Sequence, residues 1–333
     1  MVKQQKKIAV MLGGTSPERE VSKQSGKAIY NALLSLGYDV KLIDPAYGKN
    51  QPVNIEDYFA EKDYTGISNQ NVIEAVNSGL LDNIDLVVIA LHGKYGEDGT
   101  VQSLLDLKGV KYTGSGVLPS ALSMNKATSK ILFQHFDVKT PQWFVVNDKN
   151  KDASSVVKRI EEYFGFPCIL KPNDQGSTIG LSICRTRDEI QGALSLAFKF
   201  SDTVLVEEFI PGRELAVGII GSHVLPVLEI IPKHELYDYE CKYTDGMSEY
   251  VVPAKLPADV TGQLQQQAML AFNALGCTNY GRVDFRLDEN YYSYCLEVNT
   301  LPGMTSHSLV PKMAEAEGKS FEELVEQLIL TAL

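Results

Sequence analysis

The chain has 333 residues, 44% of them hydrophobic, which is enough for more than one packed domain and excludes a disordered chain. Its 31 basic and 42 acidic residues give a formal net charge of −11, which disfavours nucleic acid and anionic lipid as partners. No apolar run reaches the roughly 18 residues of a membrane span, and the polar start lacks a signal peptide's apolar region, so we expect a cytoplasmic protein.

The first third of the chain alternates short apolar runs with an amphipathic stretch. Lys7–Leu12, Tyr38–Asp44 and Asp85–Leu91 have the length and composition of strands, and a helical period runs from about Glu20 to Leu36. The polar stretch 45–83 is ambiguous. This order predicts an open, mostly parallel α/β sheet with helices on its faces.

The middle of the chain predicts a small α+β domain. One helix is expected over Pro119–Phe136, and two more over Asp152–Phe164 and Asp188–Phe200. The strands expected here are Cys168–Pro172, Ile179–Cys184 and Thr203–Phe209. The first two of these strands flank a loop of small residues.

The last third begins after Pro211-Gly212, a pair typical of a boundary. A charged, tyrosine-rich segment follows two strands, and a long helix is expected over Pro257–Leu275. The strands expected here are Glu214–Ile220, His223–Ile231, Tyr280–Leu287 and Tyr291–Val298, with helices after them. We therefore predict three domains, 1–115, 116–207 and 208–333.

Polar residues alternate on the last two predicted strands. Arg282 and Asp284 share one face of the first strand, and Glu297 and Asn299 share one face of the second. Two carboxylates and an amide oxygen on one sheet face would form an oxygen-only site, which suits Mg²⁺ bound together with substrate phosphates. A solvated outer face is the plain alternative, because charged residues at period two are ordinary there.

The register of this hairpin decides whether the polar side chains converge. A two-residue turn at 289–290 would pair Arg282 with Glu297 and Asp284 with Cys295, and all four polar residues would then face the same way. A slip of one residue would put the two pairs on opposite faces.

Lys171 ends an apolar strand and precedes the small-residue loop 173–180. Backbone N–H groups in such a loop cradle phosphate oxygens, and the lysine adds a positive charge. The GxxxxGK[ST] pattern of a P-loop does not occur in the chain. An ordinary hairpin turn with a surface lysine is the alternative.

Three further stretches carry candidate chemistry. Glu18 lies in the loop 13–20 between the first strand and the first helix, where it could bind a substrate ammonium or simply favour the helix dipole. His92 opens a glycine-rich loop, as a ligand partner or a capped loop histidine. Segment 237–243 alternates tyrosines with charges, which is typical of a lid or of a mobile surface loop.

The order of these stretches resembles the D-alanine–D-alanine ligase family, a branch of the ATP-grasp enzymes. The matching runs are GGTSPEREVS (13–22), ALHGKYGEDG (90–99), YTGSGVLPSALSMNK (112–126), ILKPNDQGSTIG (169–180), YDYECKY (237–243), GRVDF (281–285) and LEVNTLPGMTSHSLVP (296–311). The first and last runs are specific to this family, whereas the lysine and glycine-loop pattern is shared more widely. The resemblance implies a three-domain ATP-grasp fold of α/β and α+β parts.

The resemblance also implies which residues hold ATP and magnesium. Lys126 and Lys171 would hold the phosphates, under a loop that contains Gly176 and Ser177. The other nucleotide-binding positions would be Glu207, Glu208, Ile210, Glu214 and Lys242. The metal ligands would be Asp284, Glu297 and Asn299, holding two Mg²⁺ ions for which Mn²⁺ could substitute.

Implied catalytic and substrate-binding residues surround two D-alanines. Glu18 and His92 would contact the first, and Ser308 and Leu309 the second, while Arg282 and the Gly303 N–H would hold developing negative charge. Ser177 and Tyr243 would join Glu18 in a hydrogen-bonded set that closes the lid. The base for the attacking amine stays open among Tyr243, a carboxylate and the intermediate's phosphate.

The implied activity is ligation of two D-alanines through an acyl phosphate, which serves peptidoglycan and cell-wall synthesis, by a homodimer. Glu208 stands where some members of the family carry lysine, which leaves the adenine contact uncertain. Two alternatives remain: the same fold ligating D-alanine to D-serine or D-lactate, and a non-catalytic ATP-binding regulator. Tyr243 favours an amine over a hydroxy acid as the second substrate.

Overall fold

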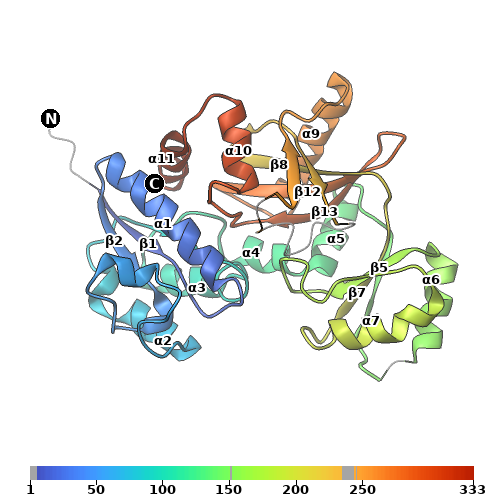
Figure 1. Ribbon diagram of the computed structural model, residues 1–333, viewed down its shortest axis with the longest axis horizontal. Coiled ribbons are helices and arrows are strands. Elements are labelled where there is room, and N and C mark those ends of the chain that lie inside the picture. The colour runs from blue at the N-terminus through green and yellow to red at the C-terminus, as the bar shows by residue number, and fades with distance from the viewer. Residues whose placement is uncertain (1–5, 151, 235–243, 245) are drawn as a thin grey trace.

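Three sheets organise the computed structural model, which describes residues 6–150, 152–234, 244 and 246–333 (Figure 1). The first sheet is parallel, in the order β2-β1-β3, with strands β1 (Lys7–Met11), β2 (Asp39–Ile43) and β3 (Leu86–Ile89). Helix α1 (Arg19–Ser35) connects β1 to β2. The predicted parallel sheet is confirmed.

The stretch that was ambiguous in sequence is mostly short helices around α2. The other helical elements of this part are η1 (Pro45–Tyr47), η2 (Ile55–Tyr58), α2 (Asn69–Asn77), η3 (Gly79–Leu81) and α3 (Thr100–Lys108). Polar side chains begin several of them: Asp44 accepts a hydrogen bond from the Ala46 N–H, and Ser68 accepts one from the Gln70 N–H.

The second sheet is antiparallel and has the order β4-β7-β5-β6. Its strands are β4 (Trp143–Val146), β5 (Cys168–Pro172), β6 (Ser182–Cys184) and β7 (Val204–Glu208). The helices α6 (Ala153–Tyr163) and α7 (Ile190–Ala197), the latter preceded by η4 (Arg187–Glu189), bury Ile160 and Ile190 against the sheet. The strand β4 was not predicted.

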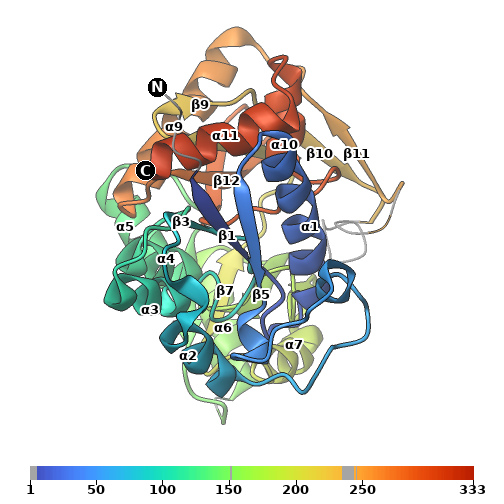
Figure 2. The same ribbon diagram turned by 90° about the vertical axis from the view of Figure 1, so that its left-hand side faces the viewer.

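The third sheet has the order β11-β10-β8-β12-β13, with β9 paired to β8. Its strands are β8 (Arg213–Ile220), β9 (His223–Val224), β10 (Leu228–Pro232), β11 (Ser248–Val251), β12 (Tyr280–Leu287) and β13 (Ser293–Asn299). Helix α9 (Ala258–Ala274) buries Phe272 against it, and α10 (Leu309–Ala316) buries Met313 in the core shared with the first sheet. Helix α11 (Phe321–Ala332) packs against α1, so the last helix of the chain lies beside the first (Figure 2).

The single helix predicted over Pro119–Phe136 is wrong, because Asn125 divides it into α4 (Val117–Met124) and α5 (Lys126–His135). Asn125 has an extended backbone, and its side chain accepts the Thr128 N–H at 3.0 Å as the cap of α5. Phe133 on α5 is buried in the core of the third sheet. Helix α5 therefore lies between the second and third sheets, and α4 packs against β13 of the third sheet (Figure 1).

Two predicted strands are also shorter than expected. His223–Ile231 is broken into β9 and β10 around Pro226, which has no N–H to give to a sheet. Ile179–Cys184 is reduced to β6, because Thr178 and Gly180 adopt positive φ angles of 63° and 71°. The division into domains 1–115, 116–207 and 208–333 stays a prediction. In the described part of the chain, every helix is too short or too polar to cross a bilayer.

Candidate functional site

Two adjoining cavities gather most of the candidate residues where the three sheets meet. The first cavity is lined by Glu18, His92, Glu97, Lys126, Gly176, Ser177, Arg282, Glu297, Asn299, Gly303, Ser308 and Leu309, among others. The second cavity is lined by Lys126, Lys171, Gly176, Ser177, Glu207, Glu208, Ile210, Glu214, Asp284, Arg286 and Glu297, among others. Lys126, Gly176, Ser177 and Glu297 line both, so the two cavities meet at these side chains.

The β12–β13 hairpin places its polar side chains on one face, as predicted, but the predicted pairing is wrong. Asp284 pairs with Glu297 and Arg282 with Asn299. The turn is longer than two residues, with Tyr291 at a φ of 62°, and a bulge after Asp284 shifts the register again. The longer turn and the bulge together shift the partner of Arg282 by two residues, from Glu297 to Asn299. Because side chains alternate with a period of two, the polar side chains of both strands still point to the same face.

Arg282 and Asp284 form a bidentate ion pair on this face. The Arg282 Nε and Nη2 each lie 2.7 Å from an Asp284 oxygen. The guanidinium lines the first cavity and the carboxylate lines the second. The pair therefore stands at the boundary between them.

Lys126 ties three elements together. Its backbone N–H donates to the Asn173 carbonyl at 3.0 Å, and its ammonium donates to the Gln175 carbonyl at 2.8 Å. The same ammonium lies 3.0 Å from a Glu297 oxygen on β13. The small-residue loop, the start of α5 and the hairpin are thus joined through one side chain.

Lys171 faces the second cavity from the end of β5 and is only 8% exposed. It donates to Glu207 on β7, which lies two residues from Leu205, the direct cross-strand partner of Lys171. Burial works against the Glu207 carboxylate, but the charges of Lys130 and Lys171 outweigh it and lower the pKa of Glu207. The carboxylate is therefore ionised between two lysines.

Glu18 is buried and accepts a hydrogen bond from the Ser177 hydroxyl. The contact joins the loop before α1 to the small-residue loop after β5, 159 positions apart in sequence. Two of the three residues predicted to form the lid network therefore meet. The third, Tyr243, lies outside the described residues, as does Lys242.

His92 and Glu97 form a buried pair beside Glu18. The His92 Nδ1 lies 3.3 Å from a Glu97 oxygen, and its Nε2 lies 3.2 Å from the Ser25 hydroxyl. Burial opposes the protonated imidazole, but the bond and charge of Glu97, with the charge of Glu18, outweigh it and raise the pKa of His92. This end of the first cavity thus collects two carboxylates and one imidazole.

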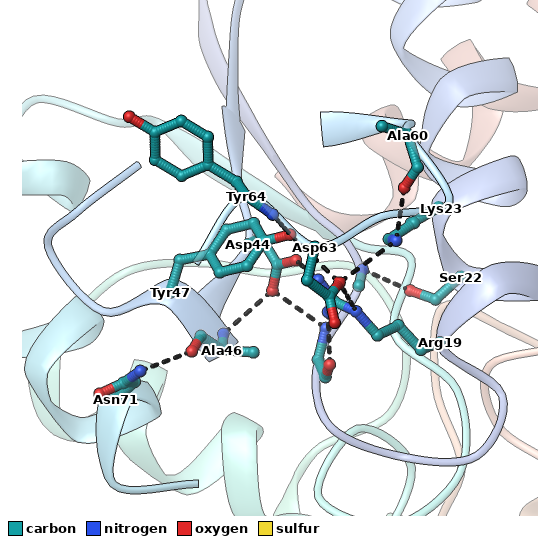
Figure 3. Close-up of polar contacts among 12 residues, drawn as sticks. Arg19, Ser22, Lys23, Asp44, Ala46, Tyr47, Ala60, Asp63, Tyr64 and Asn71 are labelled. Atoms are coloured by element: carbon teal, nitrogen blue, oxygen red, sulfur yellow. Dashed lines mark hydrogen bonds and ion pairs between the residues drawn. The ribbon is translucent and has the colours of Figure 1, made fainter. Parts of the chain in front are cut away.

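A buried ionic network holds the loop of Glu18 from the opposite side (Figure 3). The Arg19 guanidinium lies between two carboxylates, 2.6 Å from Asp44 and 2.8 Å from Asp63. Asp44 is fully buried and also accepts the Gly14 N–H at 3.1 Å. On the cavity side, Ser16 donates to the His92 carbonyl at 2.6 Å. The loop is therefore fixed on both flanks of Glu18.

Gly303, Ser308 and Leu309 line the far wall of the first cavity, where α10 begins. The Ser308 hydroxyl accepts the Thr305 N–H at 2.9 Å, which closes the loop that carries Gly303. A Cβ on Gly303 would lie 2.8 Å from that hydroxyl. The close approach explains a glycine at this position.

The adenine and ribose positions implied by the resemblance cluster in the second cavity. Glu208 ends β7, Ile210 follows the strand, and Glu214 lies on β8. Arg286 on β12 connects this group, because it lies 3.4 Å from Glu214 and donates to the Ile210 carbonyl at 3.0 Å.

Sequence reasoning missed Arg286, Glu97 and Lys130 as parts of the site. Arg286 continues the alternation of Arg282 and Asp284, so the period of two could have found it. Lys130 follows Lys126 by one helical turn, and that spacing was available as a signal. Glu97 carried no signal beyond its place in the glycine-rich loop.

The hairpin residues fit a divalent cation by the chemistry of their donors. The described residues hold no cluster of three or more histidine, cysteine, aspartate or glutamate side chains placed for a metal. Asp284 and Glu297 nevertheless face one another with the Asn299 amide on the same face. A carboxylate offers about four lone-pair positions, so pairing with Arg282 or Lys126 leaves acceptor positions for an ion shared with phosphates.

Two family models match the chain, one described as D-ala D-ala ligase N-terminus over residues 7–115 and one as D-ala D-ala ligase C-terminus over 132–330. A curated relative, the D-alanine–D-alanine ligase of Syntrophotalea carbinolica, is 42% identical, and the match covers 99% of this chain and 97% of the relative.

Two solved structures resemble the chain over nearly its whole length. The D-alanine–D-alanine ligase from Bacillus anthracis complexed with ATP has a TM-score of 0.79 and 31% identity, covering 99% of this chain and 97% of that one. The VanG D-Ala:D-Ser ligase from Enterococcus faecalis has a TM-score of 0.82 and 30% identity, covering 99% and 100%.

Proposed function

The chain belongs to the D-alanine–D-alanine ligase family, and from that premise we propose how its residues join two D-alanines into D-alanyl-D-alanine. It is an ATP-binding ligase with an ATP-grasp fold, and it serves cell-wall synthesis. The observation that carries the proposal is the pair of adjoining cavities. One presents buried lysines and the other presents Glu18, and they meet at Lys126, Gly176, Ser177 and Glu297.

ATP occupies the second cavity in this proposal. Lys126 and Lys171 hold its phosphates, with Gly176 and Ser177 in the loop above them. The adenosine part lies against Glu207, Glu208, Ile210 and Glu214, and Lys242 adds a further contact from the segment outside the described residues. The proposal is supported by two observations: the phosphate and adenosine positions all line this one cavity, except for Lys242, and Lys171 is buried in its wall.

Magnesium ions are held by Asp284, Glu297 and Asn299. When bound, they neutralise phosphate charge and orient the transferred group, which is most of what phosphoryl transfer needs from a protein. Manganese, with the same preference for oxygen ligands, would substitute.

We expect Asp284→Asn to abolish ADP formation with the fold retained. Glu289→Gln, in the exposed turn of the same hairpin, is the control and should keep wild-type turnover. Wild-type activity of Asp284→Asn would remove Asp284 from the metal site.

The two D-alanines occupy the first cavity. Glu18 binds the ammonium of the first, with His92 beside it, and Ser308 and Leu309 bind the second. Lys126 at the shared wall orients the phosphate that the first substrate's carboxylate must reach. In this proposal the carboxylate of the first D-alanine points toward ATP. The face of that carboxylate away from ATP is open to the amine of the second D-alanine.

A carboxylate is a poor acyl donor because its leaving group would be oxide. A carboxylate oxygen of the first D-alanine attacks the terminal phosphorus of ATP, the bond to ADP breaks, and an acyl phosphate forms. The deprotonated amine of the second D-alanine attacks the acyl carbon, phosphate leaves, and the peptide bond is complete. Arg282 and the Gly303 N–H stabilise the tetrahedral oxyanion, a contribution of ~3 kcal/mol per donor.

Water must be excluded while the acyl phosphate exists, and Ser177, Glu18 and Tyr243 supply the closing contacts. The Ser177–Glu18 hydrogen bond supports this part of the proposal. Tyr243 also directs the choice of an amine as the second substrate.

The proposal is tested by mass spectrometry of the products formed from ATP, Mg²⁺ and D-alanine. The expected result is D-alanyl-D-alanine with equal amounts of ADP and phosphate. Replacing half the D-alanine by D-serine or D-lactate separates the alternatives, because a mixed product in excess would identify a ligase of the D-Ala:D-Ser or D-lactate type. Nucleotide binding without any product would instead identify a regulator.

A cytoplasmic homodimer, which the family resemblance implies, completes the proposal. Light scattering after size exclusion measures the mass directly. A mass near the 36.7 kDa of one chain would contradict the dimer.

A further inference from the structure

Lys130 is a fully buried lysine that lines neither of the two cavities. It lies on α5, one helical turn after Lys126, and its ammonium is 3.0 Å from the Glu207 Oε2. The other oxygen of Glu207 accepts from Lys171, which does line the second cavity. One carboxylate thus bridges a hidden lysine and a lysine that faces the nucleotide.

The position of Lys130 is itself fixed from the third sheet. Its ammonium donates to the Thr140 hydroxyl at 2.5 Å, and that hydroxyl donates to the Cys295 carbonyl on β13 at 2.8 Å. The chain of contacts therefore runs from β13 through Thr140, Lys130 and Glu207 to Lys171. It links the hairpin that carries the metal residues to the strand that carries the phosphate lysine.

The charges of this chain explain why a costly buried lysine is present. If Glu207 had only Lys171 as a partner, the two charges would cancel and the carboxylate would attract the ammonium away from phosphates. With Lys130 on its other oxygen, the group of three has a net charge of one positive unit. Burial lowers the pKa of Lys130, with Glu207 opposing, so the fold carries this lysine at an energetic cost.

We propose that Lys130 is a positioning residue for nucleotide binding: it neutralises Glu207, so that Lys171 is held in place while its positive charge remains available to the phosphates. The inference rests on the proposed function, because it needs ATP phosphates in the second cavity. Lys130 itself touches neither substrate.

The test compares equilibrium binding of ATP, ADP and adenosine to the full chain without D-alanine. We expect Lys130→Met to weaken ATP and ADP by about tenfold or more, while adenosine binding changes by less than about twofold. Lys130→Arg keeps the charge and should restore ATP binding to within about threefold of wild type. In turnover, the KM for ATP should rise while the KM for D-alanine stays near its wild-type value.

Two further variants keep the test decisive. Thr140→Val removes the hydroxyl that orients Lys130 at nearly constant volume, and it should weaken ATP in the same direction even if Lys130→Met does not fold. Lys23→Met removes another buried lysine, 2% exposed and in the network of Figure 3, and should leave ATP binding unchanged.

Equal weakening of ATP and adenosine would overturn the inference, because it would indicate a distorted adenine pocket rather than a lost phosphate charge. Unchanged ATP binding in both Lys130→Met and Thr140→Val would overturn it as well. A wild-type chain that binds no ATP would instead overturn the proposed function, so the two failures are distinguishable.

Discussion

Glu18 and Glu20 stand two residues apart at the start of α1 and have different surroundings. Glu18 is buried in the first cavity, whereas Glu20 is exposed and pairs with Lys23 at 2.8 Å. We expect Glu18→Gln to raise the KM for the first D-alanine by about tenfold to a hundredfold, since it loses a charged hydrogen bond to the ammonium. Steady-state kinetics should show the KM for ATP nearly unchanged.

Glu20→Gln is the matched control for that variant, because it removes the same charge from the same turn. Its kinetic constants should remain at wild-type values. Equal losses in both variants would mean that Glu18 acts through the helix dipole, the alternative that the sequence left open.

At the scale of an element, two glycines near the second sheet are predicted to respond in opposite ways to alanine. Gly180 has a φ of 71°, and a Cβ there would lie 2.8 Å from Phe200 and 2.9 Å from Pro172. Gly192 lies exposed inside α7 with nothing within 4 Å of its Cβ position. Gly180→Ala should destabilise the protein by ~1–3 kcal/mol and weaken ATP binding, because the loop must shift.

Gly192→Ala should stabilise the protein by ~0.5–1 kcal/mol, because alanine is the better helix former. Denaturant unfolding measures both changes. A stable Gly180→Ala variant with wild-type ATP affinity would show that the loop does not need this backbone conformation.

The hairpin shows how far the sequence reaches and where it stops. Alternation placed Arg282 with Asp284 on one face of their strand, and Glu297 with Asn299 on one face of theirs. The common face of the two pairs depended on a predicted pairing that is wrong, and it is kept only because the turn and the bulge together shift the register by two residues. The pairing of Asp284 with Glu297 depends on the bulge and on the turn at Tyr291, and neither has a signal that a period can carry. The break at Asn125 was missed because a helical period does not reveal it, although asparagine is a preferred N-cap residue and was the available signal.

Contacts between distant segments were the least accessible to sequence reasoning. Lys130 meets Glu207, and Ser177 meets Glu18, only because three sheets assemble around the cavities. Resemblance named Ser177 and Glu18 but gave no reason for Lys130. The helical spacing from Lys126 could have indicated Lys130, but its pairing with Glu207 becomes visible only when the packing is known.

At the scale of the whole molecule, the buried group around Glu207 predicts a pH dependence of stability. The pKa of Glu207 is lowered from its ordinary value of 4.5, as burial is outweighed by Lys130 and Lys171. The ionised Glu207 therefore contributes to the free energy of unfolding. This contribution is fully present above the unfolded-state pKa of Glu207, and it is lost as the pH falls through the folded-state pKa. In Lys130→Met the carboxylate keeps one lysine, so its folded-state pKa is higher than in the wild type.

The free energy of unfolding of the wild type minus that of Lys130→Met should therefore decrease as the pH falls through and below about 4.5. Urea unfolding at several pH values between neutrality and the acid transition measures this difference, and it isolates Glu207 from the other carboxylates. A difference that stays constant over the whole range would mean that Lys130 does not affect the ionisation of Glu207.

The Ser177–Glu18 contact joins the small-residue loop after β5 to the loop before α1, and we expect closure of the whole molecule over its substrates to depend on such contacts. Ser177→Ala removes the hydroxyl and should let water reach the acyl phosphate more often. We expect the ratio of phosphate released to dipeptide formed to rise above one. The ratio is measured by a phosphate assay and mass spectrometry on the same samples.

Ser182→Ala is the control, because this serine lies on β6 and outside both cavities, and it should keep the ratio at one. If Ser177→Ala also keeps it at one with unchanged turnover, the contact does not protect the intermediate, and the exclusion of water must come from other parts of the lid.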